Sequence, residues 1–314
     1  MKNNTGIGNK KGKLTDHFIV KLIFITVVAL VISLCVFLVS VILDVTSDDK
    51  EGGDATNGDG TIKIDPSQYT VLDSISDNQL YSGDLIIVDG KNPLKKSSDN
   101  ATTVSLGSMD RPKTPAGSKY KVAYIIMETD KYKGTSEAAK ALNNMLTAFC
   151  KTKTIDTSTD EYLAVTMAKG GDGATSIYDS GLVFKLGYET AEDKIEPLYG
   201  KDTYKWIYEN AHKYGFVRYS SSKNADEASV FRYVGVAHAA KMKNEGKTLS
   251  EYIDIIRSKT YTEPLQVVGG DGKTYYVYYS EKGADLYVPQ NYSYEISGDN
   301  VGGYIVTVDA SKKK

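Results

Sequence analysis

The sequence predicts an α+β fold, preceded by one membrane-spanning helix and followed by a small β appendage. Between residues 81 and 260, helical and strand patterns follow one another in mixed order, without the repeating period of a doubly wound sheet. Beyond Thr260 the chain changes to aromatic strands separated by Gly-containing turns. Near the start, residues 22–43 form a run of twenty-two residues without a charged side chain.

Residues 22–43 are long enough to span a membrane, because roughly 20 apolar residues cross the bilayer core. Five Lys and one Asp fall in residues 1–43, whereas acidic residues dominate directly after them. Basic segments stay in the cytoplasm, so we expect a cytoplasmic tail over 1–21 and a main domain outside the cell. A cleaved signal peptide is the alternative, but its apolar core normally covers only about 7–15 residues. We favour an uncleaved, single-pass anchor in the cell membrane.

The part of the chain after residue 43 is mildly acidic and has no disulfide framework. The whole chain has net charge −2 and residues 1–43 contribute +4, so residues 44–314 carry −6. This balance argues against a nucleic-acid partner. Cys35 lies in the predicted span and Cys150 lies outside it, so they cannot pair. Cys150 ends an apolar helical face, which favours a buried small side chain over a reactive thiol.

The expected organisation has a linker, a large domain and an appendage. Residues 47–60 contain four glycines and no apolar period, which is typical of a tether. We assign the linker to 44–80, the main domain to 81–260 and the β appendage with its tail to 261–314. The period of two in the Tyr-rich run 275–279 places alternate side chains on opposite faces of a strand, where tyrosines usually pack.

Local signals predict the elements of the main domain. Gly215 and Gly246 are expected to end two helices, Asp202 to cap the first of them, and Thr248 with Glu251 to form a capping box. We expect strands over 85–88, 120–127, 162–167 and 216–219, and helices over 138–149, 203–214, 232–244 and onward from Thr248.

Residues 227–235 read Glu-Ala-Ser-Val-Phe-Arg-Tyr-Val-Gly. This stretch resembles the VanY-type D-alanyl-D-alanine carboxypeptidases, in which Glu-Pro-Trp-His is followed by an aromatic residue and Arg-Tyr-Val-Gly. Glu227 then occupies the general-base position and Arg232 matches the conserved pattern. Val230 stands where the family has a zinc-binding histidine, and an isopropyl group has no lone pair to give a metal.

A second segment carries the resemblance further, because the family holds zinc with Ser-x-His-x-x-Gly-x-x-x-Asp. Ser176 and Gly181 match that pattern, whereas Tyr178 and Lys185 occupy the two ligand positions. Upstream, Lys169 stands where the family has a substrate-binding arginine. Scaffold segments over 85–94, 210–217 and 248–252 extend the similarity across most of the main domain.

The resemblance implies a mixed or antiparallel sheet flanked by helices, with a cleft on the sheet and peptidoglycan stem peptide as the substrate class. Zinc is the family's cofactor, but all three ligand positions are replaced, so we expect no metal and no cofactor here. We interpret Glu227 as vestigial, and it could simply pair with Lys185 or Arg232. The expected cleft residues are Ser176, Tyr178, Gly181, Lys185, Lys169, Val230 and Arg232.

Three hypotheses remain open. The first is a membrane-anchored, zinc-less relative that binds stem peptide or scaffolds wall proteins. The second is an active carboxypeptidase that removes terminal D-Ala with relocated ligands, such as Asp172, Asp179, Asp226 or Glu227 together with a histidine from elsewhere in the chain. The third is a structural protein that docks another cell-wall protein through the β appendage.

Overall fold

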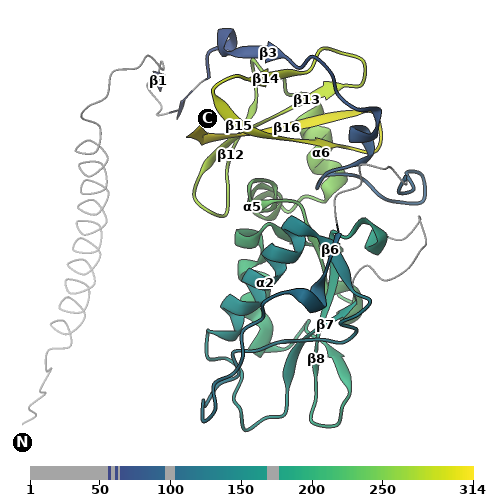
Figure 1. Ribbon diagram of the computed structural model, residues 1–314, viewed down its shortest axis with the longest axis vertical. Coiled ribbons are helices and arrows are strands. Elements are labelled where there is room, and N and C mark those ends of the chain that lie inside the picture. Colours follow the sequence, from purple (N-terminus) through teal and green to yellow (C-terminus); the bar gives the residue numbers. More distant parts are fainter. Residues whose placement is uncertain (1–55, 58–60, 63, 96–102, 168–176) are drawn as a thin grey trace, which may run out of the picture. The chain divides into compact units, whose positions relative to one another are not determined.

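The computed structural model describes residues 56–57, 61–62, 64–95, 103–167 and 177–314 (Figure 1). The expected cytoplasmic tail, the membrane span over 22–43 and the glycine-rich start of the linker lie outside these residues. Within the described ranges, no helix has both the length and the apolar character that crossing a membrane needs.

The main sheet carries the elements of the predicted domain. Its strands run in the order β10 (Phe216–Arg218), β11 (Val230–Tyr233), β8 (Val183–Glu189), β7 (Tyr162–Met167) and β5 (Ile125–Ile126), and β9 (Ile195–Pro197) also pairs with β8. The pair β5–β7 is parallel and the other pairs are antiparallel. The sheet is therefore mixed, as expected.

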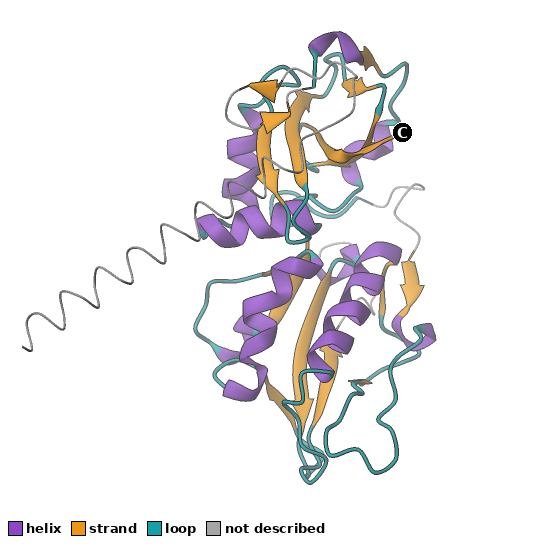
Figure 2. Cartoon of the chain, turned by 90° about the vertical axis from the view of Figure 1, so that its left-hand side faces the viewer, coloured by secondary structure: helices purple, strands orange, loops and turns teal. Residues whose placement is uncertain are grey.

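Helices cover one face of this sheet, as Figure 2 shows. The longest of the described helices is α2 (Ser136–Cys150), where Thr135 accepts a hydrogen bond from the Ala138 backbone N–H. Leu142, Met145 and Phe149 of α2 are fully buried against the sheet, and burying each contributes about 1.5–3 kcal/mol. The main hydrophobic core thus lies between α2 and the sheet, which leaves the opposite face free for a site.

The C-terminal strands form a second, wholly antiparallel sheet. Its order is β12 (Leu265–Val268), β13 (Thr274–Glu281), β16 (Gly303–Lys313) and β15 (Tyr292–Gly298). One face packs on α5 (Val236–Glu245) and α6 (Leu249–Arg257) through a shared apolar cluster. Both helices fall in the predicted 81–260 domain, so the sheet shares its core with that domain instead of standing apart from it.

The other face of the C-terminal sheet is covered by residues that the sequence places in the linker. Ile64, Tyr69 and Leu80 are buried there among strand tyrosines. β3 (Tyr69–Val71) also pairs with β14 (Tyr287–Pro289). The expected linker over 44–80 therefore overlaps a packed segment, because its scattered apolar residues gain a partner surface that is distant in sequence.

The remaining described elements are short. The strand pairs are β1 (Thr56–Asn57) with β2 (Thr61–Ile62), and β4 (Thr103–Ser105) with β6 (Lys133–Thr135). The remaining helical segments are α3 (Lys205–Asn210), α4 (Ala225–Ala228), η1 (Pro66–Gln68), η2 (Asp77–Tyr81), η3 (Leu106–Ser108), η4 (Ile177–Ser180), η5 (Asp202–Tyr204) and η6 (Ala211–Tyr214).

Two predicted strands are wrong in whole or in part. Residues 85–88 form no strand, because the Leu85 N–H donates to the Ser297 hydroxyl and the Ile87 N–H donates to the Asp299 carbonyl. Of residues 120–127, only Ile125–Ile126 joins the sheet. In both places the apolar run satisfies burial without a continuous neighbouring strand.

Two predicted helices are also corrected. Residues 230–233 belong to β11, which pairs with strands on both sides, and α5 begins only after Gly235. The stretch 203–214 is divided into η5, α3 and η6, and the Asp202 side chain does not cap it. The helix ends at Gly215 and Gly246, the capping box at Thr248 and strand 162–167 are confirmed.

Candidate functional site

Two of the positions matched to zinc ligands lie directly opposite each other on neighbouring strands. Val230 of β11 pairs with Lys185 of β8, and the adjacent Phe231 pairs with Phe184. The two phenylalanines belong to the main core. Because paired residues point to one face and successive residues alternate, Val230 and Lys185 share the face away from that core.

Lys185 is held by an ion pair with Asp226. The Lys185 Nζ lies 2.6 Å from the Asp226 Oδ1, and the two side chains are 25% and 67% exposed. Because solvent screens a pair as exposed as this one, the ion pair stabilises the fold by at most about 1 kcal/mol. The sequence suggested that Glu227 could pair with Lys185, but the neighbouring Asp226 forms that ion pair instead.

Glu227 lies exposed in the first turn of α4. The Asn224 Oδ1 accepts hydrogen bonds from the backbone N–H groups of Asp226 and Glu227, at 3.0 and 3.2 Å. This cap fixes the short helix so that Asp226, and not Glu227, contacts Lys185.

Tyr178 and Gly181 lie on and just after η4. Burial raises the pKa of Tyr178, and the nearby Tyr219 and Tyr132 add to the effect, so the phenol stays neutral. Gly181 has φ 71°, and a Cβ there would lie 3.1 Å from the Thr135 nitrogen. Glycine is therefore required where this turn packs against the start of α2. The predicted Ser176 and Lys169 lie outside the described residues.

Arg232 is buried and bonds to main-chain carbonyls. Its Nη2 donates to the carbonyl oxygens of Ile86 at 2.6 Å and Asp84 at 3.3 Å. Burial lowers the pKa of Arg232 to about 10, so it remains a cation near pH 7. Burial, followed by the nearby Glu295 and Glu137, raises the pKa of the Asp84 carboxyl to about 7. Arg232 thus holds the 84–86 segment instead of lining the cleft.

A cleft of about 370 Å³ opens beside Lys185. Met127 and Glu128 follow β5, and Met167 ends β7, so one wall forms where the two parallel strands end. β9 forms the other wall. The described side chains and backbone that line the cleft are Met127, Glu128, Tyr132, Thr166, Met167, Lys185, Leu186, Gly187, Ile195, Glu196, Pro197 and Asp226.

Gly187 allows the walls of this cleft to approach. A Cβ at Gly187 would lie 2.7 Å from the Glu196 carbonyl oxygen and 2.8 Å from the Thr166 Cγ2. Tyr132 also lines the cleft and donates its hydroxyl to the Thr166 carbonyl at 2.6 Å. Among the described residues predicted for the site, Lys185 lines the cleft, whereas Tyr178, Gly181, Val230, Glu227 and Arg232 do not.

Sequence reasoning missed most of the cleft wall, including Glu128, Ile195 and Glu196. The signal for Glu128 would have been the parallel pairing of β5 and β7, which places residues after both strands at one edge. For Ile195 and Glu196 it would have been the antiparallel pairing of β9 with β8. Two separate strand predictions do not reveal either pairing.

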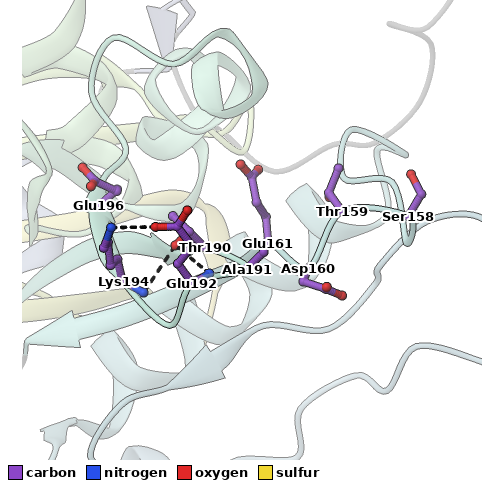
Figure 3. A pocket seen from close by; sticks show the side chains of 9 residues that line it. All are labelled: Ser158, Thr159, Asp160, Glu161, Thr190, Ala191, Glu192, Lys194 and Glu196. Carbon is purple, nitrogen blue, oxygen red and sulfur yellow. Dashed lines mark hydrogen bonds and ion pairs between the residues drawn. The ribbon is translucent and has the colours of Figure 1, made fainter.

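A larger cleft of about 470 Å³ lies at the opposite end of β7 (Figure 3). Its lining is mostly polar and comes from the residues before β7, the turn between β8 and β9, and Glu196 of β9. Lys194 pairs with Glu192 at 2.6 Å, and the Thr190 hydroxyl accepts from the backbone N–H groups of both. None of the residues matched to the family motifs lines it, so we place the candidate site at the cleft beside Lys185 in spite of its smaller volume.

The described residues bring together no group of three or more His, Cys, Asp or Glu side chains that could hold a metal ion. His238 is buried, and its ring nitrogens form hydrogen bonds with Tyr252 and Thr307, both at 2.9 Å. The Nδ1 of His212 lies 3.1 Å from the Lys243 Nζ. Both histidines have partners outside the residues that line the cleft.

Comparison with known proteins gives the relatives of this chain. It is 29% identical over 260 residues to a D-alanyl-D-alanine carboxypeptidase of Enterococcus faecium, covering 77% of this chain and 80% of that protein. A shorter match, 34% identical over 61 residues, covers 18% of this chain and 23% of a D-alanyl-D-alanine carboxypeptidase of Enterococcus faecalis. No family model matches.

Among solved structures, the chain is similar to the vancomycin-resistance D,D-dipeptidase VanXYg, crystallised with a D-Ala-D-Ala phosphinate analogue. The TM-score is 0.56 at 18% identity, with 77% of this chain and 99% of that chain covered. The mixed α+β architecture is thus that of the VanX/VanY carboxypeptidase fold. The chain is thus similar in sequence to D-alanyl-D-alanine carboxypeptidases and shares its fold with VanXYg.

Proposed function

We propose that this protein is a membrane-anchored, extracellular carboxypeptidase-like protein that binds peptidoglycan stem peptide without a catalytic zinc ion. The observation that carries the proposal is the Lys185–Asp226 ion pair, which lies opposite Val230 on the face where the family motif predicts zinc. The 29% identity to a D-alanyl-D-alanine carboxypeptidase supports the substrate class.

The side chains at the three matched positions do not fit a zinc ion. Zinc in catalytic sites takes three protein donors from His, Cys or carboxylate groups. Here Val230 offers none, Lys185 is a cation, and the Tyr178 phenol is kept neutral by burial. We therefore derive no hydrolytic step through a metal, and Glu227 has no zinc-bound water to activate.

Lys185 gives the cleft a different function. Its ammonium lies at a cleft of about 370 Å³, a volume sufficient for a short peptide. A terminal carboxylate would approach Lys185 by displacing Asp226, which is 67% exposed and gives up little on moving into solvent. A single ammonium neutralises a carboxylate but does not bind it in the bidentate manner of arginine.

The anchor belongs to the same proposal. Residues 22–43 have the length and the flanking charges of a single-pass helix with its N-terminus in the cytoplasm. That topology would place the cleft outside the cell, where peptidoglycan is.

The test is peptide binding by the full chain in detergent. We expect Nα,Nε-diacetyl-L-Lys-D-Ala-D-Ala to bind, and the same peptide with a C-terminal amide to bind at least about tenfold more weakly. Lys185→Met should remove the difference between the two peptides, whereas Lys194→Met at the other cleft should preserve it. No binding of either peptide by the natural chain would overturn the proposal.

One observation favours the active-enzyme alternative with relocated ligands. Asp179 is 8% exposed, and its Oδ2 has no hydrogen-bond partner among the described residues. A buried carboxylate oxygen of this kind accepts a cation readily. One zinc per chain, with D-Ala release that Glu227→Gln abolishes, would establish this alternative and contradict our proposal.

A further inference from the structure

The methionines that the structure describes differ in their exposure. Met145 and Met242 are 0% and 2% exposed, and Met109 is half-buried against the main core. Met127 and Met167, in contrast, are 39% and 42% exposed, and both line the cleft of the candidate site. Because oxidation of a methionine depends on solvent access to its sulfur, these two side chains are the expected targets of a soluble oxidant.

Strand pairing explains why the two exposed methionines line one cleft. Met127 directly follows β5, and its backbone N–H donates to the Val165 carbonyl of β7 at 3.1 Å. Met167 is the last residue of β7. Since β5 and β7 run parallel, the residues that follow one strand lie beside the end of the other. Both thioethers therefore belong to the same edge of the main sheet.

Met167 also lies opposite Lys185 on the neighbouring strand. The β7–β8 ladder pairs these two residues next to a β-bulge, and both line the cleft. Paired residues of antiparallel strands share one face of a sheet, with their side chains close together. The Lys185 ammonium has three N–H donors, and the Asp226 Oδ1 accepts from it at 2.6 Å. A new acceptor on the Met167 side chain would therefore compete for this ammonium.

We propose that Met127 and Met167 are oxidation sites through which a peroxide lowers the affinity of the cleft for carboxylate ligands. The thioether sulfur attacks one oxygen of hydrogen peroxide, so that an S–O bond forms and the O–O bond breaks. The proton of the transferred hydroxyl passes to the leaving hydroxide, which departs as water. Sulfur loses two electrons and becomes a sulfoxide, while the peroxide is reduced.

The two sulfoxides act in different ways. The sulfoxide oxygen of Met167 accepts a hydrogen bond from the Lys185 ammonium and competes with the terminal carboxylate of a ligand. The sulfoxide of Met127 makes an apolar part of the wall polar, which weakens contact with aliphatic groups of the ligand. We expect Met167 to cause the larger loss. Since the carboxylate is held at Lys185, this effect on binding rests on the proposed function.

The first experiment maps oxidation of the full chain in detergent. Treatment with hydrogen peroxide for increasing times, followed by proteolysis and mass spectrometry, gives a rate for each methionine. We expect Met127 and Met167 to oxidise at least about tenfold faster than the buried Met145 and Met242. Equal rates at the cleft and in the core would overturn the assignment of the two sites, independently of what the cleft binds.

The second experiment measures binding of Nα,Nε-diacetyl-L-Lys-D-Ala-D-Ala to the full chain by isothermal titration calorimetry, before and after peroxide. We expect the affinity to fall about threefold to tenfold when both methionines are oxidised. Treatment with the two stereospecific methionine sulfoxide reductases and a dithiol should restore it, because they reduce the sulfoxide back to the thioether. A loss that these enzymes do not reverse would contradict the inference.

Variants assign the loss to the cleft, each compared with its own affinity before peroxide. Met167→Leu should remove most of the sensitivity and Met127→Leu a smaller part, whereas Met109→Leu, outside the cleft lining, is the matched control and should remain fully sensitive. An affinity unchanged by complete oxidation would overturn the regulatory effect while leaving carboxylate binding at Lys185 intact. Absence of peptide binding before oxidation would overturn the proposed function and that effect together.

Discussion

The cleft beside Lys185 and the turn between β15 and β16 use charged groups in opposite ways. At the cleft, Lys185 and Asp226 are partly exposed and bond mainly to each other. At the turn, Asp299 is fully buried and accepts from the backbone N–H groups of Val301, Gly302 and Gly303. The first arrangement can exchange a partner for a ligand at little cost, whereas the second holds the C-terminal sheet together.

The largest expected effect is at the turn. Asp299 also accepts from the Tyr279 hydroxyl and from Arg257, at 2.9 and 3.1 Å. Burial alone would raise the pKa of Asp299, but these hydrogen bonds outweigh it and lower the pKa. We expect Asp299→Ala to lower the free energy of unfolding by about 3–5 kcal/mol, because it leaves several buried donors unpaired. Urea denaturation measures this, and a loss below about 1 kcal/mol would contradict the structural role.

The next effect is a loss of stability in acid at His238. Burial lowers the pKa of His238 to about 4, below its ordinary 6.5. Between these values the unfolded chain binds a proton that the folded chain does not. The contribution is therefore complete above about pH 6.5 and is lost as the pH falls toward 4, by about 3 kcal/mol.

A variant is needed to isolate that effect, because Asp84 acts in the opposite direction. Its folded pKa of about 7 exceeds its ordinary 3.8, so protonating it stabilises the fold as the pH falls through 7. Between pH 6.5 and 4 the two groups oppose each other in the natural chain, so the free energy of unfolding of His238→Gln, taken relative to that of the natural chain, should rise by about 3 kcal/mol as the pH falls through this range. Equal slopes in the two proteins would exclude His238 as the cause.

At the cleft we expect the opposite of the result at Asp299, namely a large loss of peptide binding with little loss of stability. Lys185→Met should weaken binding of Nα,Nε-diacetyl-L-Lys-D-Ala-D-Ala at least about tenfold, yet change the free energy of unfolding by no more than about 1 kcal/mol. Thermal unfolding and calorimetry of the same preparation give both values. A strongly destabilised Lys185→Met would place Lys185 with the structural residues instead.

The smallest effect is expected at Glu227. Its side chain is exposed and lies outside the cleft lining. We expect Glu227→Gln to leave peptide binding unchanged within about twofold and stability unchanged within about 0.5 kcal/mol. A binding loss equal to that of Lys185→Met would show that Glu227 still contacts the ligand.

The sequence predicted the features that depend on local signals and missed those that depend on distant residues. Elements with local signals were confirmed, such as strand 162–167, the capping box at Thr248 and the helix end at Gly246. The fold depends on pairings between distant residues, and these were missed. Residues 64–80 cover the C-terminal sheet because partners more than two hundred positions away bury them, as with Tyr69 and β14.

For the candidate site, too, the sequence predicted some features and missed those that depend on distant partners. A motif alignment placed Val230 and Lys185 at ligand positions, and β11 and β8 do pair them. It did not show that Arg232 bonds to the carbonyls of Asp84 and Ile86, or that Asp226 holds Lys185. Those partners depend on how loops fold over the sheet, which residue spacing alone does not determine.

The most direct test of the central proposal is the zinc content of the full chain, measured by plasma mass spectrometry after purification without chelators. We predict less than about 0.1 zinc per chain and no release of D-Ala, because the three matched positions do not supply the three donor groups that a catalytic zinc ion needs. The variant Tyr178→His, Lys185→Asp, Val230→His should bind close to one zinc. One zinc per natural chain with D-Ala release would contradict the proposal directly.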